Sequence, residues 1–233
     1  MSHPQNILLT GASRGIGYQT AGLLASAGHR VFCVARSRDK LEELAGAHPG
    51  RIVPLAADLS RPGEITALME EVKSRAGHLD VLIHNAGGIT VKPFGELTDE
   101  DWQYQLDVNL MSAVRLFREA VPWMNGGSHM LAISSMGGFQ GSAKFPGLTA
   151  YSVSKGALAV FTECLAAELA PRKVAVNCLC LGSVQTEMLE TAFPGLKAPV
   201  SAPEMAAYIA DFGLGGHQYY NGKILPVSLS DPG

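Results

Sequence analysis

Short apolar runs alternate with longer helix-like patterns along the whole chain. The runs are almost continuous in apolar character, which is typical of strands covered on both faces of a parallel sheet. Repeated strand–helix–strand units with right-handed crossovers place such strands in one sheet. The pattern therefore predicts an α/β fold: a single doubly wound domain over residues 1–233, with a central parallel seven-stranded sheet flanked by helices on both faces. The predicted strands are 7–9, 31–35, 52–55, 81–83, 130–133, 174–179 and 224–227.

Two long helical patterns carry apolar residues at three- and four-residue steps. The first begins near Asp99 and ends before Pro122, and the second begins near Thr149 and ends before Pro171. We expect their apolar side chains to be buried in the core. They are Trp102, Leu106, Leu110, Val114, Phe117 and Val121 in the first helix, and Leu158, Phe161, Leu165 and Leu169 in the second.

The stretch 182–222 is the least regular part of the chain and contains several Pro and Gly residues. In a doubly wound domain, ligands bind beyond the carboxyl ends of the strands, where such a late insertion lies. We expect residues 182–222 to cover the substrate; a purely structural surface loop is the alternative.

Composition excludes several classes of protein. A chain of 233 residues that is 47% hydrophobic and 17% charged is not disordered. A net charge of -3 and a pI of about 6.2 give no electrostatic basis for a nucleic-acid or membrane partner. No apolar run approaches the roughly 20 residues that span a bilayer, and the first residues show no signal-peptide pattern, so we expect a cytoplasmic protein. The Cys and His residues lack metal-ligand spacing, so we expect no metal.

A glycine-rich loop, T-G-A-S-R-G-I-G at residues 10–17, follows the first predicted strand and opens a helix. Glycines at such a place allow a tight turn and let the backbone approach a pyrophosphate closely. The helix N-terminus adds free N–H groups and a dipole that favour an anion. The loop therefore predicts a dinucleotide site, against the alternative of a merely structural turn.

The spacing G-x-x-x-G-x-G, with Thr10 before it, resembles the short-chain dehydrogenase/reductase family, and the resemblance extends over most of the chain. The segment H-N-A-G at 84–87 is similar to the family's N-N-A-G, with His84 in place of the first Asn. Asp58 and Leu59 resemble its adenine-contacting pair. Four residues match its catalytic tetrad in order: Asn109, Ser135, Tyr151 and Lys155.

The resemblance implies a Rossmann-type fold, a nicotinamide cofactor, and a homodimer or homotetramer formed through the helices that begin near Asp99 and Thr149. Leu181 departs from the family, which usually has Pro before the glycine at 182, and we expect a less preorganised nicotinamide pocket. The implied cofactor-binding residues are Gly11, Ser13, Arg14, Gly15, Ile16, Gly17, Arg36, Asp58, Leu59, Asn85, Ala86, Gly87, Tyr151, Lys155, Gly182, Val184 and Thr186.

The end of the second strand favours NADP(H) over NAD(H). A carboxylate there would accept hydrogen bonds from the ribose 2′-OH of NAD, but the first one is Asp39, beyond Arg36. Arg36 can bind a 2′-phosphate through two parallel hydrogen bonds, and Arg14 could reach the same group. The alternative is that both arginines are solvated surface charges and that NAD binds without its carboxylate.

Tyr151 and Lys155 lie four residues apart, on one face of a helix. A phenol has a pKa near 10 and is a poor acid–base catalyst at neutral pH. A neighbouring ammonium favours the phenolate, so we expect Lys155 to lower the pKa of Tyr151. Tyr151 could then exchange a proton with a carbonyl oxygen. By resemblance, Lys155 also binds the nicotinamide ribose.

Two serines, Ser134 and Ser135, end the fifth strand, and alternation allows only one to face the substrate. The family pattern points to Ser135, with Ser134 as the alternative, because the segment from Ser135 to Tyr151 is longer than usual. The excess falls at 141–147, which we expect to form a pocket wall. By resemblance, Asn109 holds a water of a proton relay; the alternative is a local cap.

These observations predict an NADPH-dependent oxidoreductase that reduces a ketone or aldehyde, with a small-molecule carbonyl substrate. A 3-oxoacyl thioester or a small ketone leads the substrate classes, and a pteridine side-chain ketone, as in sepiapterin reductase, is an alternative. A non-catalytic NADP-binding sensor or scaffold is the rival from another class. An epimerase or dehydratase of the extended branch is disfavoured, because those chains are generally longer.

Overall fold

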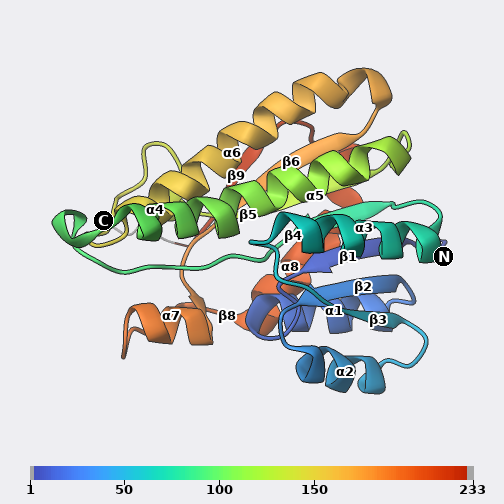
Figure 1. Ribbon diagram of the computed structural model, residues 1–233, viewed down its shortest axis with the longest axis horizontal. Helices are drawn as coiled ribbons and strands as arrows, with labels where there is room; N and C mark the ends of the chain where they lie inside the picture. The colour runs from blue at the N-terminus through green and yellow to red at the C-terminus, as the bar shows by residue number, and fades with distance from the viewer. Residues whose placement is uncertain (1–2, 230–233) are drawn as a thin grey trace.

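The computed structural model describes residues 3–229, so Met1, Ser2 and 230–233 of the predicted domain 1–233 lie outside the described residues. Its central sheet has seven parallel strands in the order β3-β2-β1-β4-β5-β6-β9 (Figure 1). The predicted doubly wound α/β fold is therefore confirmed. The strands are β1 Asn6–Thr10, β2 Arg30–Ala35, β3 Ile52–Ala56, β4 Val81–His84, β5 His129–Ser135, β6 Ala175–Leu181 and β9 Ile224–Val227.

Helices cover both faces of the sheet and enclose two separate cores (Figure 1). Successive residues of β1 point to opposite faces, so Leu8 joins one core while Ile7 and Leu9 join the other. One face is covered by α1 Gly15–Ser26, α2 Arg38–Ala47 and α8 Ala202–Gly215. The other is covered by α3 Pro62–Ala76, α5 Ser112–Ala120 and α6 Thr149–Leu169, with α4 Asp99–Leu106 leading into α5.

The predicted cover 182–222 divides into two parts with different surroundings. Its first part holds β7 Val184–Gln185 and the short α7 Glu187–Ala192, and it reaches the carboxyl ends of the strands. A small separate sheet joins β7 to β8 Val200–Ser201. The following α8 packs against α1 and buries Met205, Ile209 and Phe212 in the core. The prediction for the second part was therefore wrong, because α8 is a core helix rather than a substrate cover.

The helical region 99–120 also corrects the predicted core face. A π-helical turn, Asp107–Met111, joins α4 to α5 and rotates the buried face. Phe117 is fully buried as predicted, and Leu110 and Val121 pack against the core. Gln105 and Asn109 are also fully buried, whereas Trp102, Leu106 and Val114 are only half-buried. On α6, Leu158 and Leu169 are buried as predicted, but Phe161 and Leu165 are half-buried.

A buried histidine connects the sheet to α8 at the end opposite the glycine loop. The Nδ1 of His129 lies 2.9 Å from the carbonyl oxygen of Gly213, and its Nε2 lies 3.1 Å from Nδ2 of Asn177. These partners fit a neutral ring that donates from Nδ1 and accepts at Nε2. Burial is the main cause that lowers the pKa of His129 to about 4. The neighbouring His217 acts in the same direction, and the hydrogen bond to the Gly213 carbonyl opposes it. Protonation of Nε2 would set a second donor against the Asn177 amide.

We expect His129 to make the protein less stable as the pH falls from about 6.5, its ordinary pKa, towards 4. The unfolded chain takes up this proton first, so the stabilisation is complete above pH 6.5 and is lost as the pH falls through 4. The measurement is urea unfolding at a series of pH values from 7.5 to 4. His129→Asn should flatten the slope of unfolding free energy against pH, whereas His3→Asn, at an exposed site, should leave it unchanged. An unchanged slope in His129→Asn would contradict this account.

Candidate active site

A cavity of about 330 Å³ opens at the carboxyl ends of the central strands. Every residue predicted to bind the cofactor lines it, from the glycine loop through Arg36 and Asp58 to Thr186. Ser135, Tyr151 and Lys155 line it too, whereas Asn109 lies buried behind its wall. Residues from many separate segments of the chain therefore meet at one elongated site, where open α/β sheets bind ligands.

The glycine loop packs closely against its own backbone and against the end of β4. Gly11 has φ 70°, and a Cβ on it would lie 2.9 Å from Cα of Ala86. A Cβ on Gly17 would overlap the carbonyl oxygen of Gly11, so the loop tolerates no side chain at either place. No side chain caps α1, and its first turn holds no acidic residue. Its N–H groups are therefore free for an anion, and this geometry fits a dinucleotide pyrophosphate.

Thr10 fixes the glycine loop to the end of β4. Its Oγ1 accepts hydrogen bonds from the backbone N–H groups of Asn85, at 3.1 Å, and Ala86, at 3.0 Å. The Asn85 amide returns a hydrogen bond of 3.2 Å to the carbonyl oxygen of Thr10. Thr10 was not among the predicted site residues, although its place directly before the first glycine was the signal.

The two arginines predicted to bind a 2′-phosphate have different surroundings. Arg36 forms no ion pair with any carboxylate of residues 3–229, and its charge contributes to lowering the pKa of Asp58, after the hydrogen bond from Ser60. Arg14 instead pairs with Glu187 of α7 through Nη1 and Oε2, 3.1 Å apart. Both partners of that pair are exposed, so it is weak and leaves Arg14 free to exchange partners.

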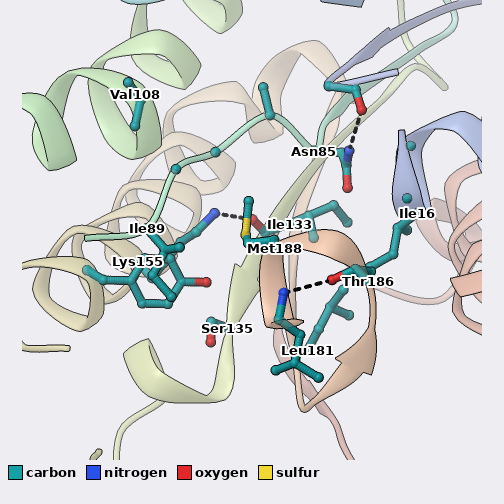
Figure 2. A pocket seen from close by; sticks show the side chains of 18 of the residues that line it. Ile16, Asn85, Ile89, Val108, Ile133, Ser135, Lys155, Leu181, Thr186 and Met188 are labelled. Atoms are coloured by element: carbon teal, nitrogen blue, oxygen red, sulfur yellow. Dashed lines mark hydrogen bonds between the residues drawn. The ribbon is translucent and has the colours of Figure 1, made fainter. Parts of the chain in front are cut away.

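Burial controls the acid–base groups on α6. Lys155 is 5% exposed, its Nζ donates to the carbonyl oxygen of Ile133 at 3.0 Å (Figure 2), and burial lowers its pKa to about 8. Burial raises the pKa of Tyr151, and a hydrogen bond with Ser135 opposes this increase. The expected lowering of the Tyr151 pKa is therefore not found in this structure, because burial outweighs the hydrogen bond with Ser135.

The two serines at the end of β5 point in different directions. The Ser134 hydroxyl is buried and donates to the carbonyl oxygen of Lys155 at 2.8 Å. Ser135 hydrogen-bonds Tyr151 and accepts from the backbone N–H of Gly137 at 3.1 Å. The side chain beside the phenol is therefore that of Ser135, while Ser134 holds the backbone of α6.

Asn109 connects the loop after β4 to α6. Its Oδ1 accepts from the N–H of Gly88 and its Nδ2 donates to the Gly88 carbonyl, both at 3.0 Å. The same Nδ2 lies 3.0 Å from Oγ of Ser154. A side-chain amide with these partners positions the loop that borders the catalytic groups.

The far end of the cavity is built by residues outside the predicted catalytic and cofactor-binding sets. They come from α4, from the loop between β5 and α6, and from α7. The long β5–α6 segment was expected to form a wall, but no periodicity indicated which of its side chains would do so. The main members are Tyr104, Met136, Phe145, Met188 and Phe193.

A protein-family model described as "short chain dehydrogenase" matches residues 5–197, most of the chain. The chain is a short-chain dehydrogenase/reductase. It belongs to a family of oxidoreductases that use a nicotinamide cofactor. In the part of this short-chain dehydrogenase/reductase that the structure describes, no cluster of His, Cys, Asp and Glu could hold a metal ion. No helix within 3–229 is long and apolar enough to cross a membrane.

Three relatives illustrate the range of the family. The 3-oxoacyl-[acyl-carrier-protein] reductase of Thermotoga maritima is 33% identical over 85% of this chain and 79% of its own. The structure of a Burkholderia cenocepacia short-chain dehydrogenase in complex with NADP is 25% identical, with a TM-score of 0.89 over 99% of this chain and 98% of that chain. L-Sorbose reductase of Gluconobacter frateurii, complexed with NADPH and L-sorbose, is 28% identical, with a TM-score of 0.87 over 98% and 97%.

The two serines should respond differently to removal of the hydroxyl. Ser135→Ala should lower turnover about 100-fold, because a positioned donor at a reacting carbonyl oxygen contributes on that order. Ser134→Ala should mainly lower the free energy of unfolding by about 1 kcal/mol, because it removes one buried hydrogen bond. Steady-state kinetics and urea unfolding of both variants measure this. Turnover lost in Ser134→Ala but kept in Ser135→Ala would reverse the assignment.

Proposed function

We propose that this protein is an NADPH-dependent carbonyl reductase that converts a ketone or aldehyde to an alcohol. The observation that carries the proposal is the meeting of Ser135, Tyr151 and Lys155 in one cavity with the glycine loop and the uncapped N-terminus of α1. When bound, the nicotinamide cofactor supplies the hydride. In this proposal four side chains bind the carbonyl oxygen and transfer the proton: those of Asn109, Ser135, Tyr151 and Lys155.

Each of these side chains has a separate task. The Ser135 hydroxyl holds the carbonyl oxygen, and the Tyr151 hydroxyl donates the proton to it. Lys155, with its pKa near 8, supplies positive charge that favours the phenolate left behind and binds the nicotinamide ribose. Asn109 serves the proton relay to Lys155, which is supported by its position between Gly88 and α6.

NADP(H) is the proposed cofactor because the adenine end of the cavity offers cations. Arg36 lines that end without a carboxylate partner among the described residues, and Arg14 can exchange Glu187 for a phosphate. The remaining proposed contacts are Gly11, Ser13, Gly15, Ile16, Gly17, Asp58, Leu59, Asn85, Ala86, Gly87, Gly182, Val184 and Thr186. The NADP and NADPH complexes of the two similar structures support this choice.

Two substrate classes lead: a 3-oxoacyl thioester and a small ketone. The Thermotoga maritima relative supports the first by its name, and the apolar far wall supports the second. A pteridine ketone is the alternative. A non-catalytic sensor is disfavoured because all four tetrad positions are filled and three of them line the cavity.

We propose that 1–233 works as one cytoplasmic NADP-binding domain, with 182–193 covering the substrate, and that it takes no nucleic-acid or membrane partner. The half-buried apolar residues Trp102, Leu106, Phe161 and Leu165 lie on the helices through which the family assembles. They support a homodimer or homotetramer, which light scattering of the purified chain measures.

Tyr151→Phe should lower ketone-dependent NADPH oxidation by at least 100-fold, because the proton donor is lost. The dissociation constant for NADPH should stay within about twofold, because the ring still fills its place. Initial rates of NADPH oxidation measure the turnover, and fluorescence titration measures the dissociation constant for NADPH. Full turnover in the variant would overturn the reductase, and tight NADPH binding with no turnover in the wild type would favour the sensor.

Arg36→Asp should weaken NADPH binding at least tenfold more than NADH binding. The new carboxylate repels a 2′-phosphate but can accept hydrogen bonds from a ribose 2′-OH. Dissociation constants of both cofactors, measured on both proteins, give the comparison. Arg38→Asp tests a neighbouring exposed arginine that does not line the cavity and should change neither constant. Equal weakening of both cofactors by Arg36→Asp would exclude the phosphate contact.

A further inference from the structure

The substrate end of the cavity has an aromatic pair at its edge. The rings of Phe145 and Phe193 lie 5.9 Å apart between centroids, with an interplanar angle of 53°. Both residues line the cavity. They come from segments far apart in the chain, the β5–α6 loop and the end of α7, so only the folded protein brings them together. This separation and tilt lie in the range of favourable aromatic contacts.

Hydrogen bonds on both sides hold Phe145 in place. On one side, Nζ of Lys144 donates to the carbonyl oxygen of Phe139 at 2.6 Å and to Oγ of Ser142 at 2.7 Å. On the other side, the N–H of Leu148 donates to the carbonyl oxygen of Phe145 at 3.3 Å. Phe145 is nevertheless 40% exposed, so the loop presents a large apolar ring to the opening instead of burying it.

Phe193 is held from the opposite side by the end of α7. Its N–H donates to the carbonyl oxygen of Leu189 at 2.8 Å. Thr186 is the N-cap of α7, and its Oγ1 accepts a hydrogen bond from the N–H of Leu189 at 3.2 Å (Figure 2). Thr186 also lines the part of the cavity proposed to bind the cofactor. The helix α7 therefore joins that part of the cavity to the Phe193 ring.

The wall beneath the two rings is apolar. It includes Ile89, Val108 and Met188, which Figure 2 shows around the catalytic groups. Among the described residues of this wall, Tyr104 contributes the one polar side-chain group. The charged side chains of the cavity are elsewhere: Lys155 at the reaction centre, Arg36 and Asp58 at the adenine end, and Arg14 paired with Glu187.

We infer that Phe145 and Phe193 select a neutral substrate that carries an aromatic or similarly flat apolar ring beside its carbonyl. This inference rests on the proposed reductase function and narrows its substrate. A ring of this kind stacks against the two phenyl groups and loses no hydrogen bonds. A pteridine would leave the polar edge of its ring unpaired against this wall. Within residues 3–229, no charged side chain lines this wall to hold the phosphates of a thioester arm, and the ammonium of Lys144, beside Phe145, is bound to the Phe139 carbonyl and the Ser142 hydroxyl.

The test compares two diketones with the same reacting group, 1-phenylpropane-1,2-dione and 2,3-hexanedione, by NADPH oxidation. In Phe193→Ala and Phe145→Ala, kcat/KM for the phenyl diketone should fall about five- to tenfold, mainly through KM, as expected for a lost aromatic contact. The value for the alkyl diketone should change less than about twofold, which also shows that the variant is folded. Phe193→Tyr keeps the ring and should retain the preference.

Phe94→Ala is the matched control, because Phe94 is 69% exposed and does not line the cavity. It should leave the ratio between the two substrates unchanged. If Phe193→Ala does not fold, Phe145→Ala, in an exposed loop, carries the test alone.

The outcomes separate the inference from the proposed function. Turnover that depends on Tyr151 but shows the same substrate ratio in wild type and alanine variants overturns the aromatic selection and leaves the reductase intact. A higher kcat/KM for acetoacetyl-coenzyme A than for the phenyl diketone would also overturn the aromatic selection and leave the reductase intact. The absence of Tyr151-dependent turnover with all three carbonyls overturns the reductase itself.

Discussion

The close contact between α6 and the turn after β5 is the constraint on which the site depends. A Cβ on Gly138 would lie 2.5 Å from the carbonyl carbon of Lys155 and from the amide nitrogen of Gly156, so the turn tolerates no side chain there. The Ser134 hydroxyl bonds the Lys155 carbonyl, and Nζ of Lys155 bonds the Ile133 carbonyl. A helix held this closely places Tyr151, one turn before Lys155 on the same face, beside Ser135 at the end of β5.

The same burial that fixes Lys155 also sets its chemistry. A buried ammonium loses solvation, so its pKa falls to about 8 and its proton becomes easier to release near neutral pH. Tyr151 shifts in the opposite direction and keeps its proton. A phenol that stays protonated is suited to donating to a carbonyl oxygen that gains negative charge, and a nearby ammonium offsets the charge left on the phenolate. The direction of this shift agrees with the proposed reduction, in which Tyr151 donates its proton.

The sheet and the cofactor residues could be predicted because each depends on a local signal. Buried parallel strands read as apolar runs, and the loop at 10–17 must contain glycine wherever backbone meets backbone. The core face of α4 could not be predicted, because a π-helical turn follows it and lets Asn109 hydrogen-bond the Gly88 backbone while Trp102 is only half-buried; on α5, Phe117 is buried as predicted. The pairing of Arg14 with Glu187 also depends on tertiary structure, which joins residues from opposite ends of the chain.

Substrate choice and catalysis depend on different parts of the molecule. The proposed catalytic groups lie at strand ends and on a long helix, where the two cores fix their positions. Phe145 and Phe193 lie on a loop and at the end of α7, and they belong to neither core. Exchanging Phe145 or Phe193 therefore costs the fold little, whereas a side chain at Gly138 would displace α6. A wall on such segments can change without disturbing the proposed proton donor, so one fold can serve different substrates.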